Sequence, residues 1–534
     1  MDNSLKRRAF LEFLGKGSLA LLVQAPVFQA LANTTRPTAA ATIQGLGPTS
    51  TDELTLIEGL QYEVLLKWGD PISEQDHYGF NNDYVAFVPL SGQDSEEGLL
   101  WINHEYISPM FVSGYTGTSE RTKEQVDKEM YEVGGTIVRV RKGSDGKWAV
   151  VYNDPLNRRI TAKTPMPFHY PKPIAGADRA IGTLANCAGG VTPWGTILTC
   201  EENYDSFYGE RDWKTGGLTG PSHYGWEKFY DYPPEHYGWV VEVDPRTGDS
   251  KKLVALGRCA HECATVKELP DGRLVVYTGD DANDECLYKF ISSKPGSLLE
   301  GTLYVANLEK GRWESLDRRK QKALRKAFKT QEEVLIRLRE ASKLVGGSLL
   351  DRPEDIEIDP VTGHVLVALT NNTPKGNYHG SILKIVEENG QYDALRFSHD
   401  TFLAGGPETG FACPDNMAFD PAGNLWFTSD ISGRSINKGP YTSFGNNGLF
   451  LVPRQGPQAG QVLQIASAPM DAELTGPYFS PDGRTLFLCV QHPGETSRSL
   501  TELTSHWPEG GSAVPKSAIV TISGPALERF QHRV

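Results

Sequence analysis

The feature that most constrains the fold is a short unit that recurs six times along the chain. In each copy an apolar strand follows a turn and runs into a cluster of carboxylate, amide or histidine side chains. A unit repeated this often predicts a repeat architecture with one functional face. The clusters are Asn103-His104-Glu105, Glu201-Glu202-Asn203, Gly279-Asp280-Asp281, Thr370-Asn371-Asn372, Thr428-Ser429-Asp430 and Gln491-His492-Pro493-Gly494-Glu495.

A second set of polar residues lies just before each turn. The start of the first strand and the end of the second lie at the same end of an antiparallel hairpin. If the hairpins are arranged radially around an axis, both sets converge on one central site. The alternative is that these residues are unrelated polar loop ends. It requires the two polar sets to be in phase by chance in all six repeats. The second set comprises Asn81-Asn82-Asp83, Asn186-Cys187, His261-Glu262, Arg352-Pro353-Glu354-Asp355, Pro414-Asp415-Asn416 and Glu473.

Composition favours one large all-β unit. The 534 residues include 55 glycines and 34 prolines, and 39% are hydrophobic, as expected of a turn-rich globular protein. The net charge of −14 argues against a nucleic-acid or anionic-membrane partner. An odd count of seven cysteines leaves at least one outside any intramolecular disulfide, and we expect most of them in the core. We expect a monomer.

Two segments interrupt the strand pattern. Residues 314–345 are rich in Lys, Arg, Glu and Leu, and Thr330 with Glu333 forms a possible capping box, which predicts a helical insertion between repeats. Residues 204–237 are rich in Tyr, Trp, Gly and Pro and predict a long ordered loop.

The N-terminus resembles a twin-arginine export signal. Lys6-Arg7-Arg8-Ala9-Phe10-Leu11 precedes a short apolar run, and Ala30-Leu31-Ala32 offers a cleavage site. The run is too short to span a bilayer. We therefore expect a signal peptide at 1–32, a flexible lead-in at 33–45 and a single domain at 46–534. The expected partner is the twin-arginine export machinery, and the expected destination is periplasmic or secreted.

The clusters are suited to binding cations. Carboxylate and amide oxygens suit Ca²⁺, Mg²⁺, Mn²⁺ or ferric iron, and converging carboxylates repel one another unless cations lie between them. Cys187 indicates a transition metal at one position, or else a buried structural thiol. Glu473 is a further candidate ligand.

Two residues could act on a substrate. Arg352 could bind a phosphate or carboxylate, or could pair with Glu354 or Asp355. His261 could be a ligand, a support for a ligand, a general acid or a structural histidine.

Several cations beside an arginine would suit phosphoester cleavage. A calcium-dependent lactonase or phosphotriesterase on a propeller is an alternative. A non-catalytic binding propeller is another, and it predicts an exposed aromatic face built from Tyr204, Phe207, Tyr208, Tyr224 and Trp226.

Taken together, the motifs resemble the PhoX family of bacterial alkaline phosphatases, from about residue 78 to residue 495. The resemblance implies an exported phosphomonoesterase on a six-bladed β-propeller, with a helical insertion and long inter-blade loops. It also implies an Fe³⁺ and Ca²⁺ cluster on the axis and a metal-bridging oxygen nucleophile. The motifs are Asn103-His104-Glu105-Tyr106, the run from Asn186 to Thr196, Cys200-Glu201-Glu202-Asn203, His261-Glu262, Gly279-Asp280-Asp281, Asp351-Arg352-Pro353-Glu354-Asp355 and Gln491-His492-Pro493-Gly494-Glu495.

The resemblance also implies roles for individual residues. Cys187 matches an iron-binding cysteine, and Glu262 and Glu354 match glutamates that bind iron or calcium. Glu201 and Glu202 match carboxylates on the calcium side, and Arg352 matches the arginine that holds the substrate phosphate. Cluster position alone adds four candidate metal ligands: Asp280, Asp415, Asp430 and Glu473.

Overall fold

The computed structural model describes residues 42–92 and 96–531. Ile43–Val534 form one compact unit. The predicted signal peptide and residues 33–41 of the predicted lead-in lie outside the described residues. Within the described part of the chain, no helix combines the length and apolar character needed to cross a membrane.

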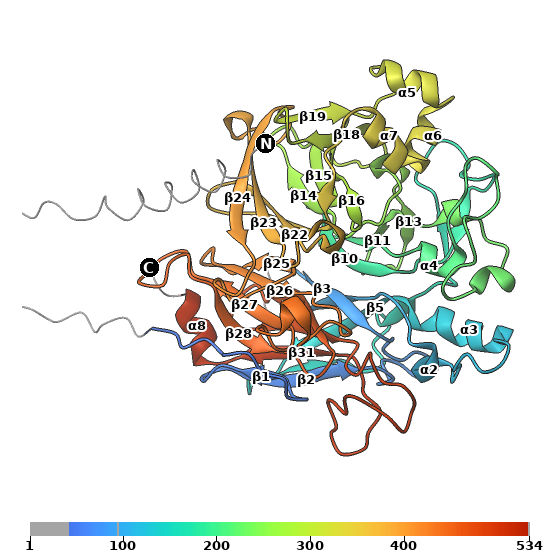
Figure 1. Ribbon diagram of the computed structural model, residues 1–534. Coiled ribbons are helices and arrows are strands. Elements are labelled where there is room, and N and C mark those ends of the chain that lie inside the picture. Colours follow the sequence, from blue (N-terminus) through green and yellow to red (C-terminus); the bar gives the residue numbers. More distant parts are fainter. Residues whose placement is uncertain (1–41, 93–95, 532–534) are drawn as a thin grey trace, which may run out of the picture. The chain divides into compact units, whose positions relative to one another are not determined.

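Six antiparallel sheets surround a common axis, so the predicted six-bladed β-propeller is confirmed (Figure 1). Blade 1 contains β3 (Asn82–Pro89), β4 (Glu97–His104), β5 (Gly134–Lys142) and β6 (Trp148–Val150), with β7 (Arg158–Ile160) beside β5. Blade 2 contains β10 (Asn186–Val191), β11 (Ile197–Glu201), β12 (Val240–Val243) and β13 (Ser250–Lys252). Blade 3 contains β14 (Thr265–Glu268), β15 (Leu274–Gly279), β17 (Leu287–Ser292), β18 (Gly301–Asn307) and β19 (Arg312–Ser315).

The later blades follow the same order from the axis outward. Blade 4 contains β21 (Pro353–Ile358), β22 (Val365–Leu369), β23 (Ser381–Glu387) and β24 (Phe397–Ala404). Blade 5 contains β25 (Pro414–Phe419), β26 (Leu425–Ser429), β27 (Gly448–Val452) and β28 (Leu463–Ser467). Blade 6 contains β29 (Glu473–Phe479), β30 (Leu486–Gln491) and β31 (Ala518–Ser523). Two small ribbons pair β8 (Pro165–Pro167) with β9 (Arg179–Ile181) and β16 (Asn283–Glu285) with β20 (Leu350–Asp351).

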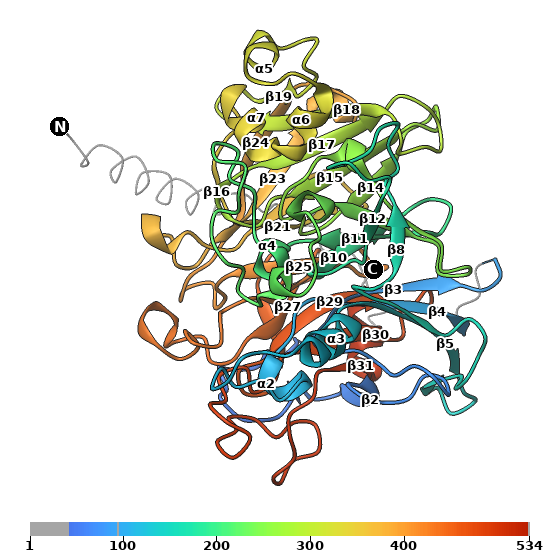
Figure 2. The same cartoon turned by 90° about the vertical axis from the view of Figure 1, so that its right-hand side faces the viewer.

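Strands from the start of the described chain complete the last two blades. β2 (Gln61–Lys67) pairs with β31 as the outermost strand of blade 6, and β1 (Thr55–Leu56) pairs with β28 of blade 5. The blue β1 and β2 accordingly lie beside the orange and red β28 and β31 in Figure 1. The innermost strands contact their neighbours around the ring, and β29 returns to β3. Figure 2 shows the inner strands β3, β10, β25 and β29 close together, with α5 at the upper edge.

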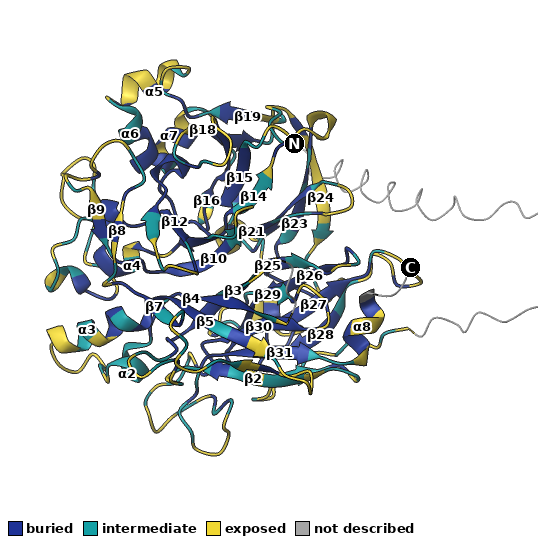
Figure 3. Ribbon diagram, turned by 180° about the vertical axis from the view of Figure 1, so that it is seen from behind, coloured by how far each residue is buried: buried dark blue, intermediate teal, exposed yellow. Residues whose placement is uncertain are grey.

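The core consists of apolar layers between neighbouring blades. Trp101 of blade 1 and Val241 of blade 2 belong to one such layer, and both are fully buried. A middle strand such as β30 is buried along its whole length, because each of its faces packs against side chains. The sequences of such strands are continuous apolar runs, because apolar and polar residues alternate only where one face of a strand is exposed to solvent. Figure 3 shows the strands mostly buried, whereas much of α5 is exposed.

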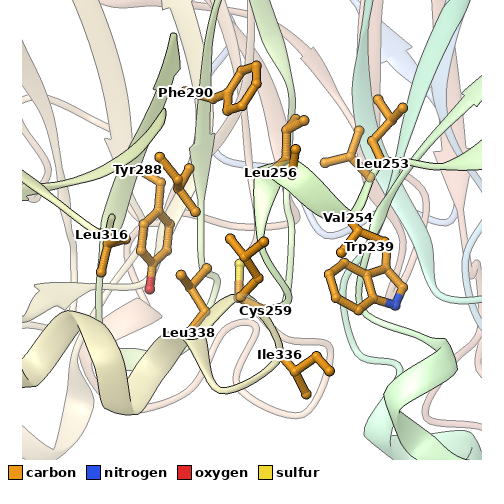
Figure 4. Packing of buried hydrophobic residues seen from close by; sticks show 14 of the residues in the cluster. Trp239, Leu253, Val254, Leu256, Cys259, Tyr288, Phe290, Leu316, Ile336 and Leu338 are labelled. Carbon is orange, nitrogen blue, oxygen red and sulfur yellow. The ribbon is translucent and has the colours of Figure 1, made fainter. Parts of the chain in front are cut away.

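The helical insertion after blade 3 is confirmed and consists of three helices. These are α5 (Lys322–Ala327), α6 (Gln331–Ile336) and α7 (Leu338–Leu344). The hydroxyl of Thr330 accepts a hydrogen bond from the Glu333 amide at 3.1 Å, which caps α6. Arg337, at φ −103° and ψ 48°, separates α6 from α7. Figure 4 shows Leu338 packed close to Cys259 and Tyr288, which anchors the insertion to the propeller.

The exposed aromatic face expected of a binding propeller is wrong, because all five residues proposed for it are buried, namely Tyr204, Phe207, Tyr208, Tyr224 and Trp226. Phe207 and Trp226 are fully buried and pack edge to face against each other. Their cluster includes Val126 and Met130 of α3 (Lys123–Glu132) and Phe207 of α4 (Asp205–Tyr208). Within the described part of the chain, the α-helices not yet named are α2 (Pro109–Val112) and α8 (Pro525–Gln531). All seven cysteines are unpaired and buried.

Candidate active site

A recurring backbone geometry brings the polar set that precedes each turn to the axis. In five blades, a non-glycine residue in the left-handed region stands two positions before a candidate ligand, a conformation that side chains rarely adopt. A bulge follows in the inner strands β3, β10, β21 and β25, and bulges re-aim side chains. The left-handed residues are Asn81, Ala185, Arg352, Cys413 and Asp471, and the candidate ligands are Asp83, Cys187, Glu354, Asp415 and Glu473.

A backbone hydrogen bond brings the other polar set, the clusters that follow the second strands, to the same place. In each of five blades, the residue just after the second strand, or two positions after it in blade 3, donates its amide to the carbonyl that precedes the first strand. The bonds run from Glu105 to Asn81 (3.1 Å), Glu202 to Ala185 (2.8 Å), Asp281 to Ala260 (2.9 Å), Thr370 to Arg352 (3.1 Å) and Asp430 to Cys413 (2.8 Å). The two sets therefore meet at one end of the blades, as the hairpin argument predicts.

A cavity of about 160 Å³ lies where these residues converge. It is lined by Asp83, Glu105, Tyr106, Cys187, Glu202, Asn203, Glu262, Asp281, Arg352, Glu354, Asp415, Asp430, Glu473, Gln491 and His492. Eight of these were singled out from the sequence, namely Cys187, Glu202, Glu262, Arg352, Glu354, Asp415, Asp430 and Glu473. Three others, Glu201, Asp280 and His261, do not line the cavity.

Glu201 forms a buried ion pair away from the cavity. Its Oε1 lies 2.6 Å from Nζ of Lys252, and both side chains are 0% exposed. Its Oε2 accepts hydrogen bonds from the amides of Gly238 and Trp239, at 2.9 and 3.1 Å. Successive side chains along a strand point to opposite faces, so only one of Glu201 and Glu202 can face the axis. That one is Glu202.

Asp280 and His261 are also engaged elsewhere. Both oxygens of Asp280 accept from Arg339 of the helical insertion, at 2.9 and 2.6 Å. The ring nitrogens of His261 lie 2.8 Å from the Thr278 hydroxyl and 2.8 Å from the Gly257 carbonyl. Burial lowers the pKa of His261 to about 4, so the ring is neutral near neutral pH. A proton-transfer role for His261 has no geometric support here.

Of the seven lining residues that were not chosen as site residues from the sequence, four are acidic residues or a histidine: Asp83, Glu105, Asp281 and His492. All four stand inside the clusters quoted above, so the residue types gave no basis for choosing among neighbours. Side chains alternate between the two faces of a strand, and this alternation together with the pairing of the hairpin indicates which of two neighbouring residues faces the cavity. Asn82 pairs with His104, and the residue that follows each of them in the chain lines the cavity. These residues are Asp83 and Glu105.

Seven of the lining residues form three adjoining groups that could each hold a metal ion. The groups are Asp83, Glu105 and Cys187, then Cys187, Glu202 and Glu262, then Glu262, Asp281 and Glu354. Within a group the potential ligand atoms lie within 4.8 Å of one another. Cys187 and Glu262 each belong to two groups, and the Cys187 thiol lies 3.3 Å from Glu262 Oε1. Ions bound in adjoining groups would therefore share ligands.

The electrostatics of the cluster fit cations. Burial, followed by repulsion from neighbouring carboxylates, raises the pKa of Glu262 well above its usual range, and the same holds for Glu202. Burial and the nearby Asp83 and Glu262 likewise raise the pKa of the Cys187 thiol. Asp83 Oδ1 and Glu262 Oε2 are buried and have no hydrogen-bond partner among the described residues. Bound cations would supply the missing partners and offset the repulsion.

Arg352 lies across the cavity in contact with three carboxylates. Its Nε and Nη2 donate to both oxygens of Asp281, at 2.9 and 2.8 Å. Nη2 also lies 2.8 Å from Glu354 Oε1, and Nη1 lies 3.1 Å from Asp430 Oδ2. Burial lowers the pKa of Arg352, but these carboxylates raise it by more. The pKa therefore lies well above its usual value, and the side chain stays charged. A guanidinium has five N–H groups, so these contacts leave one N–H of Nη1 for another oxygen.

The chain is similar to known proteins over most of its length. The family model described as alkaline phosphatase PhoX matches residues 42–494. The structure of Pseudomonas fluorescens PhoX in complex with vanadate, a transition state analogue, is 29% identical, with a TM-score of 0.81 over 91% of this chain and 98% of that one.

A Dyadobacter fermentans protein of unknown function matches far less well. It is 11% identical, with a TM-score of 0.37 over 88% of this chain and 100% of that one, and supports no conclusion. None of the curated proteins compared with the chain matches it. The family model spans most of the chain, and the chain therefore belongs to the PhoX family of alkaline phosphatases.

Proposed function

We propose that this alkaline phosphatase hydrolyses phosphomonoesters in the axial cavity and releases inorganic phosphate. The observation that carries the proposal is the position of Arg352, whose guanidinium shares one buried cavity with three adjoining groups of potential metal ligands. A phosphoryl group bound there would meet a fixed positive charge on one side and bound cations on the other.

We assign the cations by the chemistry of the donor atoms. Cys187 is the one sulfur donor lining the cavity and suits ferric iron, with Glu262 as a neighbouring ligand. The hard oxygens of Glu202, Asp281 and Glu354 suit Ca²⁺. When bound, these cations polarise the phosphoryl oxygens and stabilise the leaving oxygen.

The chain's own residues bind and orient the substrate. Arg352 is held by Asp281 and Asp430 on opposite sides, which fixes the plane of the guanidinium. Its remaining N–H can then donate to a phosphate oxygen without a change of rotamer. Asp430 stays ionised, because Arg352 and neighbouring groups lower its pKa by more than burial raises it.

The remaining assignments extend the proposal beyond the site. We infer export by the twin-arginine machinery, with activity in the periplasm or outside the cell, from Arg7-Arg8 and the residues around them. We also infer a monomer.

The test is elemental analysis of natively exported protein, paired with hydrolysis of 4-nitrophenyl phosphate before and after calcium chelation. We expect iron and several calcium ions, phosphate release, loss of activity on chelation, and inhibition by inorganic phosphate. Lactone or phosphotriester substrates provide the comparison. Turnover of a lactone with no release of phosphate from any monoester would refute the proposal.

A further inference from the structure

Blade 4 departs at the cavity from the pattern that blades 1, 2, 3 and 5 share. In four blades, the residue that donates its amide to the carbonyl before the first strand is a carboxylate that lines the cavity: Glu105, Glu202, Asp281 and Asp430. In blade 4 the equivalent residue is Thr370, which is fully buried and does not line the cavity.

The same blade carries Arg352 at its left-handed position, where the side chain lies between the carboxylates of the two neighbouring blades. Asp281 of blade 3 and Asp430 of blade 5 both contact the guanidinium. A carboxylate at position 370 would point toward this same region and would compete for Arg352. The small side chain of Thr370 leaves the region to the guanidinium.

The hydroxyl of Thr370 also fixes the ligand next to it. Its Oγ1 lies 2.8 Å from Glu354 Oε1 and 2.9 Å from the carbonyl oxygen of Pro414, the first residue of β25. Glu354 Oε1 is the oxygen that Arg352 contacts at 2.8 Å. The hydroxyl therefore holds the Glu354 carboxylate in the orientation that meets Arg352, and it also contacts the first residue of the next blade.

We propose that Thr370 is a positioning residue for substrate phosphate. It orients Glu354 against Arg352, and its small side chain keeps a second carboxylate of blade 4 from competing with phosphate for Arg352. This role rests on the proposed function, because it acts through the arginine that binds phosphate. Thr370 itself touches neither substrate nor cation in this assignment.

The experiment compares phosphate binding, KM and metal content among variants at this position. Thr370→Val keeps the side-chain shape and removes the hydroxyl, Thr370→Ser keeps the hydroxyl, and Thr370→Asp restores the carboxylate of the other blades. Thr485→Val is the matched control. Thr485 is a buried threonine of blade 6 that lies directly before β30, at the end of the β29–β30 hairpin opposite to the cavity, and its hydroxyl accepts a 3.1 Å hydrogen bond from Trp148.

We expect Thr370→Val to weaken inorganic phosphate binding, measured by calorimetry, and to raise KM by about tenfold, as loss of a hydrogen bond to a charged group implies. Iron and calcium content should stay at the wild-type level, Thr370→Ser should recover most of the loss, and Thr370→Asp should bind phosphate more weakly than Thr370→Val. If Thr370→Val does not fold, Thr370→Ala serves as the hydroxyl-free variant.

Wild-type phosphate affinity and KM in the hydroxyl-free variant would overturn the proposal. An equal loss in Thr370→Ser, or in Thr485→Val, would also overturn it, because the effect would then be structural. Failure of the proposed function would show differently, as absence of phosphomonoester turnover in the wild-type enzyme, and calorimetry with inorganic phosphate tests Thr370 without turnover.

Discussion

Replacing Glu201 by glutamine should destabilise the fold and leave the metal content unchanged. Glu201 is the residue that a search for calcium ligands singles out from the sequence, but its carboxylate forms a 2.6 Å ion pair with Lys252, and both side chains are fully buried. The neighbouring Glu202 lines the cavity instead. The two adjacent glutamates should therefore behave in opposite ways.

The expected magnitude follows from burial. The amide of glutamine cannot neutralise Lys252, and removing one partner of a buried ion pair costs about 3–5 kcal/mol. Burial already lowers the pKa of Lys252, and loss of its proton in the variant would keep the cost toward the lower end. Glu202→Gln should have the reverse effect in metal-free protein. Burial and repulsion raise the pKa of Glu202, so removing its charge relieves repulsion.

The assay is denaturant unfolding of chelator-treated protein, with elemental analysis of the untreated protein. Glu201→Gln should unfold at lower denaturant and contain the wild-type amount of iron and calcium. Glu202→Gln should lose metal without a comparable loss of stability. A double variant, Glu201→Gln with Lys252→Met, should recover stability, because no buried charge is left unpaired and the glutamine oxygen can still accept from the amides of Gly238 and Trp239. If Glu201→Gln instead loses metal and keeps wild-type stability, the assignment of the two glutamates is refuted.

Three further predictions concern the cavity. Cys187→Ser should lose iron and most activity, and full retention of both, measured by elemental analysis and phosphate release, would contradict the assignment of the thiolate. Arg352→Ala should raise KM and weaken inhibition by phosphate by about tenfold or more, since it removes hydrogen bonds from a charged group; unchanged inhibition constants would exclude the phosphate-binding role. Metal-depleted protein should lose stability as pH rises above about 6.5. The pKa of Glu262 is raised in the folded protein, so its contribution is fully present below the unfolded pKa of about 4.3 and is lost as pH rises through the folded pKa. The pKa of His261 is lowered to about 4, so its contribution is lost as pH falls from about 6.5 toward 4, and the two contributions offset each other between about 4.3 and 6.5. Melting temperatures across pH, with and without added Ca²⁺, check both signs, and a curve that calcium leaves unchanged on the alkaline side would count against the cluster.

The sequence by itself determined the repeat and the end of the blades at which function lies. Apolar strands that end in polar clusters recur in phase, and antiparallel pairing brings both polar sets to one end of each hairpin. The choice of Cys187 and Arg352 also came from the sequence, because a thiol and an arginine stand out among carboxylates. Residue type and local spacing carry this information without any knowledge of packing.

Only the tertiary structure decided which of two adjacent acidic residues faces the axis. Glu201 and Glu202 are chemically alike, and so are Asp280 and Asp281, but backbone pairing within the blade decides which one points inward: Glu202 and Asp281 each bond to the carbonyl before the first strand and line the cavity. The partners of the others come from distant chain segments: Lys252 for Glu201, and Arg339 of the helical insertion for Asp280. Closure of the ring by β2 against β31 is likewise a long-range pairing. Such pairings depend on how far-apart segments pack, which local sequence patterns do not encode.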